Sequence, residues 1–244
     1  EVDVKGVVST FTYSDYTYEN ITIDGAYNQG GFEGALTLDD SNGAIELYGA
    51  VNLSKQLPTF DFYATVRDLQ PQNLNLTNLH EEAHLSLDIR ANFTGSTIDN
   101  VNGEINIDSL RFNSPEANYF LPNFNVRAVN TSKENLLTVH SNFLDARIAG
   151  KYAFNTLPTC LSSLLHKYLP SLVSKPLKTH KHKNNFSFVL NIYDTTILET
   201  LIKLPIRLET QSTLSGYFNE ESEKFSIEAN FPKLFYKNRA IESG

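Results

Sequence analysis

The side chains best suited to chemistry in this sequence are a carboxylate pair and two neighbouring histidines. Asp39 and Asp40 stand together, and paired carboxylates can serve as general acid and general base. They fall in the run Asp-Asp-Ser-Asn-Gly, whose residue types favour tight turns, so we interpret them as solvated turn residues. His180 and His182 could bind a metal ion, but the lysines around them repel cations. Neither pair predicts an active site.

The remaining reactive groups do not predict an active site either. His80 and His84 are four residues apart, which suits metal ligands only on a helix, and His84 opens an alternating strand where we expect exposure to solvent. Cys160 has no His–Asp pattern beside it, so we interpret it as an apolar helix residue and not a nucleophile. No glycine-rich loop for phosphates occurs. We therefore expect no enzyme, no cofactor and no metal site.

Two surface features suggest binding instead. Four lysines follow a predicted amphipathic helix and could touch anionic lipid headgroups, although a solvated loop is the interpretation we favour: Lys175, Lys178, Lys181 and Lys183. Three tyrosines, Tyr13, Tyr16 and Tyr18, would suit the glycan site of an extracellular β-sandwich adhesion module. Such sites often use tryptophan as well, and the chain contains none.

Composition narrows the class further. The 244 residues carry a formal net charge of −8, which argues against a nucleic-acid partner because such a partner needs a basic face. The single cysteine excludes an internal disulfide and fits either a reducing compartment or a periplasmic protein. No apolar run reaches the length of a membrane-spanning helix. Because methionine is absent, we expect an excerpt or a processed chain, from which a targeting segment could be missing.

Alternation of apolar and polar residues is the main structural signal. Ile45, Leu47 and Val51 share one parity, for example, whereas Glu46 and Tyr48 take the other, and Asn, Asp and Gly mark the turns between such runs. The pattern recurs along most of the chain. We expect an all-β protein with a dozen or more strands, mostly antiparallel.

Two stretches predict short amphipathic helices. Residues 157–175 place a leucine stripe on one side, with a break near Pro170, and residues 194–203 have Asp194 or Thr195 as a candidate N-cap. We expect the first helix to lay its stripe against the sheet as a plug: Leu161, Leu165, Leu169 and Leu172. This divides the chain into a first β segment at 1–156, the helix and basic loop at 157–185, and a second β segment at 186–244 that continues the same sheet.

A sheet that is apolar on one side must cover that side. At about 25 cal/mol per Å² of apolar surface, leaving a dozen strand faces in water would cost tens of kcal/mol. The sheet could fold on itself as a sandwich or barrel, or helices could cover it, but two short helices are too few. It could also curl along its length so that another apolar substance, such as lipid acyl chains, fills the trough.

Several stretches resemble a known family. Residues 21–77, beginning ITIDGAYNQGGFEGALTLDD, are similar to the middle of TamB-type proteins of the translocation and assembly module, within the AsmA-like superfamily. ANFTGSTIDNVNGEINIDSLRF, HKYLPSL and the closing TLSGYFNEESEKFSIEANFPKLFYKNRAIESG resemble further parts of the family. The resemblance covers most of the chain, and its motifs are specific in combination and weak singly.

The resemblance implies an elongated, curled β-sheet, the β-taco, with an apolar U-shaped groove. It implies a periplasmic segment of a protein anchored in the inner membrane and reaching the outer membrane, carrying phospholipid acyl chains between them. The alternative within the family is a scaffold for outer-membrane protein assembly with a BamA-like barrel partner, contacted through parts outside this segment. The expected groove lining comprises Ile45, Leu47, Val51, Leu53, Phe60, Phe62, Val66, Leu85, Leu87, Ile89, Phe93, Ile105, Ile107, Phe186, Phe188, Leu190, Ile192, Phe225 and Ile227.

Overall fold

Strands dominate the chain. The computed structural model describes residues 1–157, 159, 163, 184–202, 206–208, 210–236 and 239–242. The strands are β1 (Val2–Tyr13), β2 (Tyr16–Asn28), β3 (Gly31–Asp40), β4 (Gly43–Asn52), β5 (Thr59–Leu69), β6 (His84–Thr94), β7 (Asn102–Asn113), β8 (Asn118–Asn130), β9 (Asn135–Ser141), β10 (Leu144–Lys151), β11 (Asn185–Ile192), β12 (Ile206–Leu208), β13 (Ser212–Asn219), β14 (Lys224–Asn230), β15 (Lys233–Tyr236) and β16 (Arg239–Glu242).

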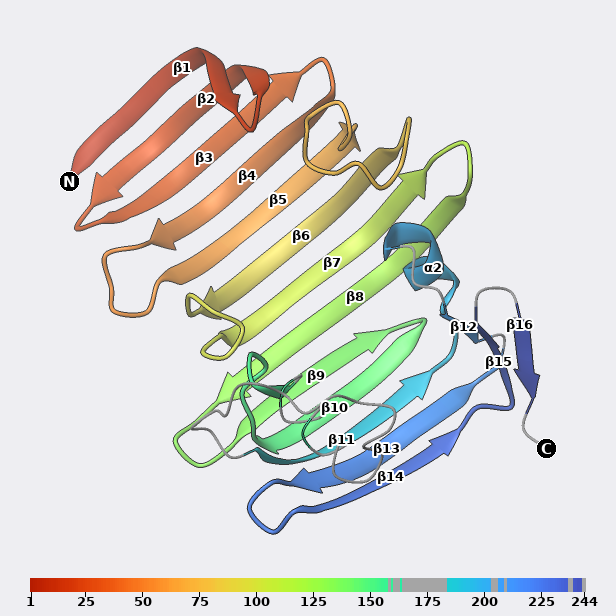
Figure 1. Cartoon of the computed structure of the whole chain (residues 1–244). Coiled ribbons are helices and arrows are strands. Elements are labelled where there is room, and N and C mark those ends of the chain that lie inside the picture. The colour runs from red at the N-terminus through yellow and green to blue at the C-terminus, as the bar shows by residue number, and fades with distance from the viewer. Residues whose placement is uncertain are drawn as a thin grey trace.

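Thirteen of these strands form one antiparallel sheet. They lie side by side in chain order from β1 to β14, with β12 left out (Figure 1). The all-β, antiparallel prediction is therefore confirmed. β11 pairs with β10, from Lys151 opposite Asn185 to Leu144 opposite Ile192, so the sheet continues on both sides of residues 152–184. β12, β15 and β16 make a separate three-stranded sheet, so the last segment does not wholly continue the large one.

One short helix follows β11. α2 (Thr196–Ile202) matches the helix predicted at 194–203, with narrower bounds. Of the two N-cap candidates, Asp194 caps the helix with its side chain, because its carboxylate accepts the Thr196 N–H at 2.8 Å. The Thr195 hydroxyl oxygen instead accepts the Leu208 N–H of β12 at 2.7 Å. Among the described residues, no helix is long and apolar enough to cross a membrane. Within the predicted plug at 157–172, the structure describes residues 157, 159 and 163. Its leucine stripe lies outside the described residues: Leu161, Leu165, Leu169 and Leu172. The same is true of Cys160, His180, His182 and the four lysines.

Two β-bulges shift the pairing of β5, β6 and β7 near one end of these strands. Asp68 and Ser109 have φ of 48° and 53°, and the pairing shifts beside each of them. A bulge adds one residue to a strand, so the side chains beyond it change face. Here the change keeps Leu69 of β5 and Leu110 of β7 on the side that carries Val66.

Glycines at two strand centres allow neighbouring strands to approach. Gly49 has a φ of 148°, and a Cβ built there would lie 2.5 Å from the Phe62 Cα. Gly103 has a φ of 138° and is equally close to the Phe93 Cα. Only glycine tolerates both the positive φ and this approach. At both positions a phenylalanine side chain stands opposite the missing side chain.

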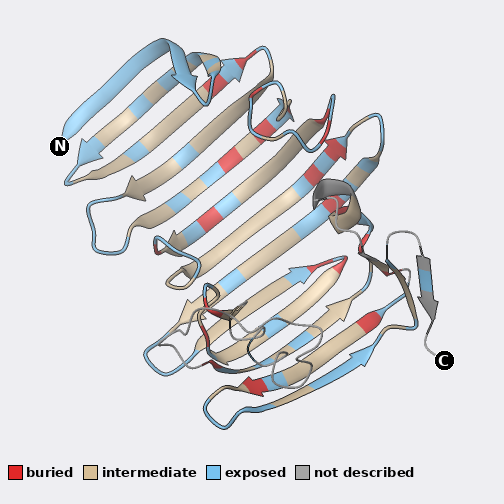
Figure 2. Cartoon of the chain, viewed as in Figure 1, coloured by how far each residue is buried: buried red, intermediate tan, exposed pale blue. Residues whose placement is uncertain are grey.

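The buried core is small and gathers where the bulges lie. Most strand residues are half-buried or exposed, and buried segments are few (Figure 2). One cluster joins Ala83, Leu110, Phe112, Leu121 and Phe143 with Ile197 of α2. A second joins Val66, Leu69 and Leu74, the last of them in the loop between β5 and β6 and fully buried. α2 and the β5–β6 loop thus cover the apolar side of the sheet at the strand ends where the bulges lie.

Candidate functional site

The two sides of the large sheet differ sharply in chemistry. Directly paired residues in an antiparallel ladder place their side chains on the same side. We call the side that carries Leu47, Phe62 and Leu190 the apolar face, and the other side, with Asp61 and Arg90, the polar face. The cross-strand register identifies the members of each.

Two rows of the apolar face cross all thirteen strands. The first contains Val4, Gly25, Gly34, Gly49, Phe62, Ala91, Ile105, Val126, Val139, Ala146, Leu190, Leu214 and Ala229. The second contains Val2, Tyr27, Phe32, Val51, Phe60, Phe93, Gly103, Ala128, Leu137, Ile148, Phe188, Gly216 and Ile227. Neither row contains a charged residue, and the Tyr27 hydroxyl is the one polar group.

These rows run at right angles to the strands. Strands lie 4.7–4.9 Å apart, so twelve steps make an apolar track about 57 Å long. In the second row Phe60 and Phe93 stack with ring centroids 4.6 Å apart. Phe186 and Phe218, which are paired on the same face beside that row, have centroids 5.8 Å apart. An elongated apolar ligand could follow the track without passing a charged side chain.

The predicted lining residues fall on this face with one exception. Leu53 lies beyond the end of β4 and is 66% exposed. Val66 is buried, Ile227 on the edge strand β14 is 52% exposed, and the other sixteen are half-buried. Half-burial arises because neighbouring side chains shield one another while the described elements leave the middle of the face uncovered.

Alternation alone missed part of this face. Leu110 and Phe112 have the wrong parity relative to Ile105 and Ile107, so a strict period of two assigns them to the polar face. The bulge at Ser109 turns them back to the apolar face, where both are buried. A positive φ at a serine leaves no clear mark in the sequence.

The carboxylate pair also behaves differently from the prediction. Asp39 is exposed, but Asp40 is buried, so the interpretation of both as solvated turn residues is wrong for Asp40. Its carboxylate accepts hydrogen bonds from the Tyr16 hydroxyl at 2.5 Å, the Asn42 N–H at 2.9 Å and the Glu19 N–H at 3.0 Å. Asp40 ties the β1–β2 hairpin to the β3–β4 turn and is structural.

The remaining candidates are also structural. Tyr16 and Tyr18 pack edge to face at 4.8 Å and join the cluster around Leu74, so they do not form an open platform for a glycan with Tyr13. His80 is buried edge to face against Phe112, whereas His84 lies half-exposed with Nδ1 2.8 Å from an Asp68 oxygen.

Comparisons with known proteins assign no family to this chain. No protein-family model, curated protein or solved structure matches this chain.

Proposed function

We propose that the apolar face is a track for phospholipid acyl chains, in a periplasmic segment of an AsmA-like bridge between the inner and outer membranes. The observation that supports the proposal is the pair of unbroken apolar rows across all thirteen strands. The resemblance to TamB-type proteins supplies the ligand and the location. In this proposal the sheet curls about its long axis and the chains lie in the trough.

The chemistry of the face suits hydrocarbon. Burying apolar surface is favourable by about 25 cal/mol per Å², and it gives no preference among positions along a uniform track. A chain could therefore slide with little change in free energy. A single unpaired charge would interrupt it, because desolvating such a charge costs several kcal/mol.

Adjacent residues of β11 provide a matched test. Leu190 belongs to the first apolar row, whereas Val189 points to the polar face, is 46% exposed and lies opposite Arg147. We expect Leu190→Asp to abolish lipid transfer between vesicles of phosphatidylethanolamine and phosphatidylglycerol by the intact protein. Val189→Asp should transfer at the wild-type rate, because its carboxylate stays in water beside an arginine. Resistance to protease checks that both variants are folded.

Contact with lipid can be measured separately from transfer. The photoreactive residue p-benzoylphenylalanine, placed at position 190, should crosslink to phospholipid in the same vesicles, and the same residue at 189 should not. Equal crosslinking at the two positions, or equal transfer by the two aspartate variants, would refute the lipid track.

One observation favours the scaffold alternative. Among the strands that the structure describes, β1 pairs with β2 alone, and all twelve of its residues are exposed. An open strand edge can template another strand, as in β-augmentation. If this is the function, defects should follow proline substitutions in β1, and the comparison of positions 190 and 189 should show no difference.

A further inference from the structure

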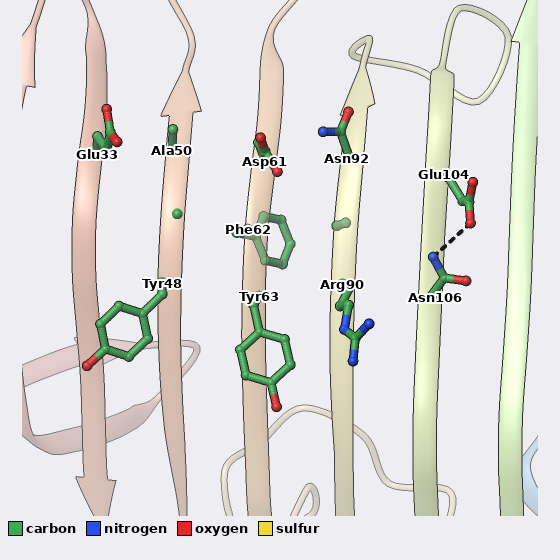
Figure 3. A pocket seen from close by; sticks show the side chains of 12 residues that line it. Glu33, Tyr48, Ala50, Asp61, Phe62, Tyr63, Arg90, Asn92, Glu104 and Asn106 are labelled. Atoms are coloured by element: carbon green, nitrogen blue, oxygen red, sulfur yellow. Dashed lines mark hydrogen bonds between the residues drawn. The ribbon is translucent and has the colours of Figure 1, made fainter.

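The polar face has a hollow over β3 to β7. Its volume is about 490 Å³, and two cross-strand rows form it. Figure 3 shows one row with Glu33, Ala50, Asp61, Asn92 and Glu104 and the next with Tyr48, Tyr63, Arg90 and Asn106. Positions two apart on a strand put the rows about 7 Å from one another. Ala50 carries only a methyl group in the first of these rows, which leaves the space between the larger side chains open.

Two exposed tyrosines stand side by side on the polar face at the hollow. Tyr48 and Tyr63 are directly paired across β4 and β5 and are 57% and 40% exposed. The Tyr63 ring is held in place, because its hydroxyl donates to an Asp88 oxygen at 2.9 Å and accepts from the Thr65 hydroxyl at 3.0 Å. Exposed, fixed aromatic rings offer flat apolar surface and a polar edge at little entropic cost.

The neighbouring row, which contains Asp61, Asn92 and Glu104, provides hydrogen-bonding groups. Glu104 is also fixed, since its Oε1 accepts from the amides of Asn106 at 2.9 Å and Asn125 at 2.8 Å. Asp61 and Asn92 are exposed toward the hollow. Three carboxylates and one guanidinium line it, so its net charge is negative and disfavours an anionic ligand.

We propose that this hollow binds an oligosaccharide of uncharged or amino sugars. The apolar faces of its rings would lie on Tyr48 and Tyr63, and its hydroxyls would bond to Asp61, Asn92 and Glu104. Sugars combine flat C–H faces with rings of hydroxyls, and this arrangement meets both. The site is on the opposite face from the lipid track and does not depend on it.

The experiment is calorimetric titration of the intact protein with three tetrasaccharides. Chitotetraose and its deacetylated form should bind, and the anionic tetragalacturonate should not. Tyr48→Ala should weaken binding by at least about tenfold, because a ring contact is lost. Tyr63→Phe keeps the ring but loses the two hydrogen bonds that hold it, so it should weaken binding less than Tyr48→Ala does. Tyr217→Ala is the control, since Tyr217 is also exposed on the polar face but lies in β13, outside the hollow.

Three results would overturn the proposal. The first is no binding of either chitotetraose or its deacetylated form at millimolar concentration. The second is equal binding by wild type and Tyr48→Ala, with urea unfolding confirming that the variant is folded. The third is binding of tetralysine without either sugar, which would make the hollow a site for cationic peptides.

Discussion

Asp40 shows how one residue fixes a local arrangement. Three donors converge on its two oxygens, so each oxygen of the buried carboxylate accepts at least one hydrogen bond. Burial alone would raise the pKa of Asp40, but these hydrogen bonds, led by the Tyr16 hydroxyl, hold the pKa below its ordinary value. Burial, and then the hydrogen bond to Asp40, raise the pKa of Tyr16. The carboxylate is the stable form throughout the neutral range.

Asp40→Asn should therefore destabilise the fold. Asparagine offers one acceptor oxygen and an NH₂ group, which must face at least one of the three donors. Leaving a buried donor unsatisfied costs about 1–3 kcal/mol in the free energy of unfolding. Because the pKa is lowered on folding, the wild-type contribution should also disappear as pH falls through that pKa. Urea unfolding at neutral and acid pH measures both effects.

Asp39→Asn is the matched control for that substitution. Asp39 is exposed, and its change should alter the free energy of unfolding by less than about 0.5 kcal/mol at either pH. If Asp40→Asn were as stable as Asp39→Asn at neutral pH, the hydrogen bonds to Asp40 would not be stabilising.

At the scale of elements, the strands were predictable and their ends were not. Runs such as 185–192 alternate cleanly, and the structure pairs them with apolar residues on one face. The β5–β6 loop was not predicted to pack, because Leu74 stands among turn-forming residues without any period. Its burial depends on Val66 and Leu69, which the bulge at Asp68 places on the same face, and on Tyr18, which is distant in sequence.

This loop should contribute strongly to stability. Leu74 is fully buried in its cluster, so Leu74→Ala removes apolar contacts and leaves a cavity. Such a change typically costs about 2–5 kcal/mol. Leu76→Ala, two residues on and 52% exposed, should cost little. Thermal unfolding compares the two, and equal midpoints would show that the loop does not stabilise this end of the sheet.

At the scale of the whole molecule, the period of two predicted more than the separate strands. Residue parity assigned the apolar side chains of each strand to one face of the sheet. In the structure, consecutive antiparallel strands pair these residues directly opposite one another, so they form continuous rows across the sheet. Sequence could not show whether such a sheet folds onto itself, since a sandwich and an open track share the same alternation. The difference lies in what covers the apolar face.

X-ray scattering in solution distinguishes these two shapes. A compact globule of this length has a radius of gyration of about 18 Å and thus a diameter of about 46 Å. Thirteen strands in one sheet span about 57 Å, and with the strand length the diagonal reaches about 70 Å. Curling about the long axis would narrow the sheet without shortening it. We therefore expect a maximum dimension above about 57 Å, and a value near 46 Å would mean that the sheet closes on itself and leaves no track.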